Sequence, residues 1–372
     1  MKNKLTVFEA VSIISIITIA QIVLDFPEYL IDLTGTGTVA NLAFLLFFIS
    51  FFCIIITKIF KNFANQDIID ISELVGGKFL KTLISLILIV FLFLAIIIAT
   101  SNFTFIVKNT YFKNYHFLFV FSIFILAIIV ACFKGFSSTK KVATFFFGIL
   151  VISIFCLTLG DNGNFNTNNL VPFFGFDYKT TFGTGLTNSF IFNFIIVYFF
   201  LMPLIAKKNN YPKIVFWSLL LNFILITVSV IAILQYYPTS VTKTISDVSS
   251  SNIILAVTRR IQISSFLSQT DSIFILFWTY AILCHISILI HGIFYIFEKN
   301  FHYEDKRNLT FSIIPIVLGG TILINNVAKL HYLEKYIFNN FSIVLTFGIL
   351  FLILIIGHFK NKKGTKNVKA KK

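Results

Sequence analysis

The sequence predicts an all-α integral membrane protein of about ten transmembrane helices. Of its 372 residues, 57% are hydrophobic and only 12% are charged, whereas soluble domains have about 45–50% apolar and about 25% charged residues. The hydrophobic residues also fall into long runs, and a helix needs roughly 20 of them to cross a bilayer. This composition leaves no room for a soluble catalytic or nucleic-acid-binding domain.

Ten apolar runs are long enough to be transmembrane spans. The first run follows a short basic N-terminus and lacks a small-residue cleavage site, so we interpret it as a retained span rather than a signal peptide. The ten predicted spans are Phe8–Ile31, Val39–Phe60, Leu80–Val107, Phe117–Phe133, Val142–Leu159, Gly185–Ala206, Ile214–Tyr236, Ser272–Phe297, Leu309–Val327 and Phe338–Phe359.

The distribution of basic residues indicates how these spans are oriented. Of the 30 Lys and Arg residues, 22 lie in the N-terminus, the C-terminal tail and the connectors on one side, and eight lie on the other side. The positive-inside rule then places both termini in the cytoplasm, where basic residues also meet anionic lipid headgroups. We therefore expect a single transmembrane domain over residues 1–359 and a basic cytoplasmic tail over residues 360–372. The net charge of +15 reflects membrane topology rather than nucleic-acid binding.

Polar residues interrupt the first predicted span. Gln21, Asp25 and Glu28 are spaced i, i+4 and i+7, so they share one face of a helix. Pro27 lacks a backbone donor and clashes with the preceding turn, which predicts a break near Ile22–Val23. A broken span frees backbone groups that need a protein-lined or wet cavity, and such breaks form substrate sites in transporters. The alternative is that the acidic residues mark the outer end of a tilted span.

Other spans also contain polar side chains. Asn102 in the third span and Asn193 in the sixth can line the same cavity, or can form interhelical hydrogen bonds. His285 and His291 in the eighth span are six residues apart, so they lie on different helix faces and are not a metal pair. We expect both to be packed, neutral histidines. The four cysteines lie in apolar runs without CxxC spacing, and they predict neither a disulfide framework nor a metal site.

One stretch outside the spans, Ile253–Phe266, predicts a short amphipathic helix. Arg259 and Arg260 lie on one side of it, and Ile254 and Val257 lie on the other. Such a helix lies in the plane of a membrane interface. We expect it at the outer interface, or covering an outer vestibule.

A series of short motifs extends over nearly the whole chain. The motifs are Lys4-Leu5-Thr6-Val7-Phe8-Glu9-Ala10 before the first span, Pro27 after its break, Asn169-Leu170-Val171-Pro172 and Phe173-Phe174-Gly175 before the sixth span, Leu201-Met202-Pro203-Leu204 with Asn209 and Lys213 at its exit, and Asp271 to Trp278 at the start of the eighth. Their order and spacing resemble the B subunit of bacterial spore germination receptors, a family of the amino acid–polyamine–organocation transporter superfamily. Relatives commonly have Gly-x-Gly at the first-helix break, where this chain has Ala20-Gln21-Ile22. The usual acidic or glycine position near Asn193 is not kept either, and both changes narrow the pocket.

The resemblance implies a transporter-like fold of five plus five spans in an inverted repeat, with helices 1 and 6 broken. It implies a nutrient-germinant receptor subunit of the spore inner membrane, with no enzymatic activity and no cofactor. Its partners would be A-type and C-type receptor subunits and the lipid bilayer, and it would not bind nucleic acid. A small germinant such as an amino acid would bind between spans one, three, six and eight. The ligand-binding residues predicted in this way are Ala20, Gln21, Ile22, Asp25, Asn102, Asn193 and Trp278.

Three other functions remain open from the sequence. A proton-coupled amino-acid transporter of the same fold would need a protonatable residue such as Asp25 or His285. A multi-span acyltransferase would need a catalytic His with an Arg or Asp partner inside the membrane, and the span of His285 offers none. A purely structural scaffold subunit would explain the missing glycines.

Overall fold

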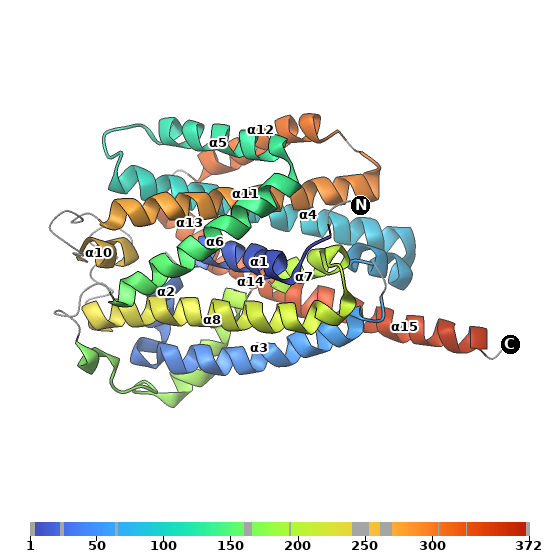
Figure 1. Cartoon of the computed structure of the whole chain (residues 1–372), viewed down its shortest axis with the longest axis horizontal. Coiled ribbons are helices and arrows are strands. Elements are labelled where there is room, and N and C mark those ends of the chain that lie inside the picture. Colours follow the sequence, from blue (N-terminus) through green and yellow to red (C-terminus); the bar gives the residue numbers. More distant parts are fainter. Residues whose placement is uncertain are drawn as a thin grey trace.

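The computed structural model describes residues 4–22, 26–63, 66–159, 166–192, 195–239, 253–260, 270–303, 305–324 and 326–369. These residues form a bundle of helices, most of which run along the long axis of the molecule, and the two termini lie at the same end (Figure 1). The helices are α1 (Val7–Ile22), α2 (Phe26–Thr34), α3 (Thr38–Phe60), α4 (Ile68–Thr110), α5 (Phe117–Lys134), α6 (Phe136–Leu159), α7 (Ile195–Leu201), α8 (Tyr211–Tyr236), α10 (Ile253–Arg260), α11 (Thr270–Phe301), α12 (Lys306–Leu323), α13 (Val327–Tyr332), α14 (Asn339–Ile343) and α15 (Phe351–Lys369).

The predicted all-α membrane architecture is confirmed. Within the described ranges, seven helical segments are long and apolar enough to cross a membrane, and the segments Val7–Ala20 and Ile195–Leu204 are shorter apolar helices. The 18-residue helix α12 covers most of the ninth predicted span. Together these segments account for the ten predicted spans.

Spans one and six each contain more than one described helical segment. The described part of the first span consists of α1, to Ile22, and α2, from Phe26. The break that Pro27 predicts falls on residues 23–25, which lie outside the described residues. The sixth span consists of the 3₁₀ segment η4 (Thr184–Phe192), then α7, then the 3₁₀ turn η5 (Met202–Leu204). The first and the sixth of ten spans are equivalent positions in a repeat of five plus five, so this arrangement fits the predicted transporter-like fold.

Helix α1 lies at the centre of the bundle. It packs against α6, α8 and α11, and its residues from Ala10 to Ala20 are all buried. The mostly apolar sequence of α1, whose polar residues in this stretch are small (Ser12, Ser15 and Thr18), suits this position, because a helix surrounded by other helices needs no polar face. In Figure 1, α5 and α12 lie on one side of this core, and α3 lies on the opposite side.

Two connectors and the C-terminal tail are more helical than the sequence predicts. The segment Lys61–Phe79, predicted as a loop, contains the first turns of α4, which Asp67 and Asp70 begin with reciprocal hydrogen bonds to each other's backbone. Helix α4 bends at Gly76 and Gly77, where Gly77 has a φ of +69° that favours glycine. The predicted connector Ala328–Ile337 is helical over α13 and the turn that follows it. The predicted tail continues α15 as helix to Lys369, because the lysine-rich tail has no helix-breaking proline.

Candidate functional site

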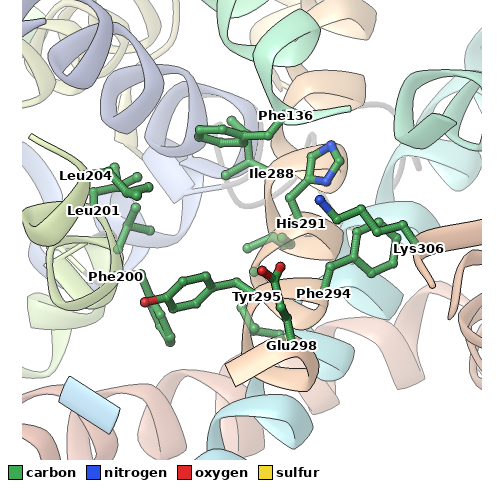
Figure 2. Close-up of a pocket in the computed structure, with 14 residues that line it drawn as sticks. Phe136, Phe200, Leu201, Leu204, Ile288, His291, Phe294, Tyr295, Glu298 and Lys306 are labelled. Atoms are coloured by element: carbon green, nitrogen blue, oxygen red, sulfur yellow. The ribbon is translucent and has the colours of Figure 1, made fainter. Parts of the chain in front are cut away.

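A cavity of about 210 Å³ lies in the half of the bundle nearer the termini. It lies between α4, α6, the α7–η5 segment, α11 and the start of α12 (Figure 2). Its walls are mostly apolar, and they are formed by side chains that include Leu92, Phe136, Phe200, Leu201, Leu204 and Ile288. The volume is below the roughly 300–1,000 Å³ of sites for drug-sized ligands, so the cavity suits a smaller molecule.

The polar groups of the cavity come from α11 and α12. Figure 2 shows the His291 ring and the Lys306 ammonium close together, with the Glu298 carboxylate on the same side. His291 is 8% exposed, and its Nε2 atom has no hydrogen-bond partner among the described residues. Glu298 and Lys306 are exposed at the rim. The cavity therefore combines an apolar interior with one acidic and one basic group at its edge.

A buried ion-pair cluster holds the α11 wall of this cavity in place. The Lys299 ammonium lies 2.5 Å from Asp67 Oδ2 and 2.6 Å from Asp70 Oδ2. The Tyr295 hydroxyl, whose residue lines the cavity, donates to the same Asp67 oxygen. The Asp67 side chain is fully buried, so this carboxylate depends on its partners in place of water. The cluster fastens the C-terminal end of α11 to the beginning of α4.

A second contact joins α11 to the first span. His285 Nδ1 lies 3.0 Å from the backbone carbonyl oxygen of Ile17 in α1. A carbonyl only accepts hydrogen bonds, so Nδ1 carries the proton. His285 is 1% exposed, and its Nε2 atom has no partner in the described part of the chain. This confirms a packed histidine, and it places a polar ring one turn before the end of α1.

Trp278, one of the predicted ligand-binding residues, lies farther along α11 from the cavity, toward the start of that helix. Gly292 of α11 is level with Leu92 of α4, and Trp278 is level with Phe103, whose ring centroid is 5.5 Å away, so the two helices are antiparallel. The 14 residues from Trp278 to Gly292 span about 20 Å of helix. His285 lies between these two levels on α11.

The structure describes only some of the predicted residues. Ala20 and Trp278 are buried, and Asn102 is half-buried on α4; none of these three lines the cavity. Gln21 and Ile22 belong to the last turn of α1, but the structure does not describe their side chains. Asp25 and Asn193 lie outside the described residues. The site predicted from the sequence thus remains a prediction.

Helix α10 lies at the end of the bundle opposite the termini (Figure 1). Four of its apolar residues are buried, and it packs against α8 and α11. Arg259 Nε donates to Asp271 Oδ2 at 2.9 Å, and the Tyr111 hydroxyl donates to the same oxygen at 3.2 Å. Burial and the nearby Asp271 carboxylate raise the pKa of Tyr111 to about 12, so this hydroxyl stays a neutral donor. The predicted amphipathic helix is confirmed over Ile253–Arg260, and residues 261–266 lie outside the described chain.

Several polar residues of these clusters were missed by reasoning from the sequence. Asp67 precedes an apolar run and has Asp70 three positions later, which is a signal for a helix start. No sequence signal pairs these residues with Lys299. Asn41 on α3 was also missed, although its amide donates to the Thr181 carbonyl at 2.8 Å and its Oδ1 accepts from the Asn188 amide at 3.1 Å.

The fold defines a multi-pass helical membrane protein with a cavity among its helices. Residues 4–330 match the family described as spore germination protein, and the chain belongs to this family. Among solved structures, the chain is similar to an Eremococcus coleocola manganese transporter, determined in complex with an aromatic bis-isothiourea substituted compound. The identity is 11% and the TM-score 0.49, over 96% of this chain and 86% of that chain. No curated protein matches the sequence.

Proposed function

We propose that this protein is the subunit of a germination receptor that senses a small nutrient, with an amino acid as the ligand class. The family places the chain in germination. The observation that supports the ligand class is the composition of the cavity, which is apolar inside and has Glu298 and Lys306 at its rim. An amino acid with an apolar side chain matches these groups, because its ammonium pairs with a carboxylate and its carboxylate with an ammonium.

Signalling would follow from a difference in affinity between two conformations of the bundle. A ligand shifts a conformational equilibrium only when it binds one state better than the other. The cavity meets the interrupted sixth span at Leu201 and Leu204, and α11 connects it to α1 through His285. Occupation of the cavity would therefore change how these helices pack. In this proposal the change passes to A-type and C-type subunits in the spore inner membrane, with both termini in the cytoplasm.

Gene deletion tests the proposal. Spores that lack the gene, in a strain without redundant receptors, should fail to germinate with at least one amino acid in a nutrient panel. Reintroduction of the gene should restore that response. Normal germination of the deletion strain with every nutrient would contradict the proposal.

Replacing Lys306 with glutamine should raise the germinant concentration that gives a half-maximal response. An exposed ion pair contributes about 0.2–1 kcal/mol, so we expect a shift of up to about fivefold. The measurement is the concentration dependence of germination in spores with equal amounts of each variant. Arg307→Gln is the matched control, because Arg307 is the next residue and does not line the cavity. Equal responses of the two variants would remove Lys306 from the site.

A proton-coupled amino-acid transporter of the same fold is the second candidate. The observation that favours it is the pair of buried histidines on α11, each of which has an Nε2 atom without a partner among the described residues. A histidine ring with a free nitrogen can relay protons. Uptake of labelled amino acids by proteoliposomes, driven by a proton gradient and lost in His285→Asn, distinguishes this function from sensing alone.

A further inference from the structure

The segment between α6 and η4 exposes a group of large apolar side chains. In the eight residues Val171–Tyr178, the exposed side chains are Val171, Phe173, Phe174, Phe176 and Tyr178, and Phe176 is 87% exposed. The segment lies at the end of the bundle opposite the termini, beside α3 (Figure 1, lower left). A group of this size on a surface indicates a binding partner.

Hydrogen bonds hold the backbone of this segment against the start of α3. Thr36 Oγ1 donates to the Pro172 carbonyl at 2.8 Å, and Thr181 Oγ1 donates to the Phe174 carbonyl at 3.1 Å. Gly37 and Gly175 allow close approach, since a Cβ atom at either would lie 2.7 Å from Thr181 Oγ1. The aromatic side chains are thus presented by a fixed backbone.

The exposed side chains continue a surface of α3 that faces away from the bundle. Phe47 and Phe51 on this surface are 79% and 63% exposed, as expected for residues that contact lipid. The Phe182 ring packs on Phe44 of α3 at a centroid distance of 5.5 Å. The segment therefore lies beside the outer part of a membrane-spanning helix, at the level where a bilayer ends.

The charge of the segment also fits a lipid environment. Residues 165–176 include no charged residue. The first carboxylate after them, that of Asp177, accepts hydrogen bonds from the backbone amides of Lys179 and Thr180. Aromatic residues are enriched where a membrane meets water, because their rings suit the headgroup boundary.

We propose that Val171–Tyr178 is a lipid-binding anchor whose phenylalanine side chains enter the membrane leaflet at the end of the bundle opposite the termini. The acyl chains of that leaflet cover the rings of Phe173 and Phe176. The anchor fixes the connector before the interrupted sixth span against the bilayer. This role does not depend on the ligand proposed for the cavity.

Spin labelling of the full-length chain tests the anchor. A nitroxide label is attached at Phe176→Cys. The chain also carries Cys156→Ser, which removes the exposed native thiol. The labelled protein is reconstituted in vesicles of phosphatidylglycerol and phosphatidylethanolamine. Collisions with oxygen, which concentrates among acyl chains, are compared with collisions with a water-soluble nickel complex. Two labels serve as controls. One is at Phe47→Cys, on the lipid-facing side of α3, and the other is at Lys113→Cys, in an exposed turn.

We expect the label at position 176 to collide mainly with oxygen, as at position 47. Its ratio of oxygen to nickel collisions should be several-fold higher than at position 113. A ratio equal to that at position 113 would show that the segment faces water and would overturn the proposal. A label that meets neither reagent would show that protein covers the segment, and would overturn it as well.

Discussion

Replacing Asp67 with alanine should lower the free energy of unfolding by about 3 kcal/mol. Removing one partner of a buried ion pair costs about 3–5 kcal/mol because the other charge stays buried, and the loss of a helix cap adds about 1 kcal/mol. Lys299 retains Asp70 as a partner at 2.6 Å, which reduces the cost. The measurement is unfolding of the purified protein by sodium dodecyl sulfate in mixed micelles.

Two control variants separate the contributions to this loss. Asp67→Asn keeps an oxygen that can cap α4 at the Asp70 amide, 2.9 Å away, so it reports the charge alone. Glu73→Gln breaks the ion pair with Lys81, in which the Glu73 side chain is 38% exposed, and exposed pairs contribute about 1 kcal/mol or less. If Asp67→Ala cost no more than Glu73→Gln, the buried cluster would not fasten α11 to α4.

Replacing Leu204 with phenylalanine should abolish ligand binding while the protein remains folded. Leu204 lines the cavity and is only partly buried, so a larger ring can extend into a space of about 210 Å³ without displacing the packed core. The measurement is the thermal stability of the purified protein across a panel of amino acids. A ligand at about 100 times its Kd stabilises the wild-type chain by about 2.7 kcal/mol, and the variant should show no such gain.

Leu276→Phe is the matched control for this prediction. Leu276 lies on α11 like much of the cavity wall, but its side chain is 55% exposed on the outer surface of the bundle. We expect this variant to respond to ligand as the wild type does. Equal stabilisation of Leu204→Phe and the wild type by the same amino acid would show that the ligand binds elsewhere.

The sequence was sufficient to predict the transmembrane architecture. Apolar runs of helical length can satisfy their backbone only as helices in a membrane, and this physical constraint is local. Pro27 is likewise a local signal, and it is the second residue of α2, in the first turn, where a helix tolerates proline. The amphipathic helix α10 follows from the spacing of its arginine and isoleucine residues.

The cavity and its ion-pair cluster depend on contacts that the sequence does not specify. Tyr295 and Asp67 are 228 positions apart, yet their side chains share a hydrogen bond. Leu204 lines the cavity and Leu276 faces outward, but both are leucines in apolar runs. In a membrane protein an apolar side chain suits lipid, core or cavity equally well, so periodicity does not separate these positions.

The most direct test of the account measures germination in spores that carry single cavity variants. In a strain lacking this gene and redundant receptors, the wild-type chain and Leu276→Phe should restore germination with the responsive amino acid. Leu204→Phe, at equal abundance in the spore membrane, should not restore it at any concentration. Full restoration by Leu204→Phe would contradict the claim that the cavity beside the interrupted sixth span is the site where the protein senses its nutrient.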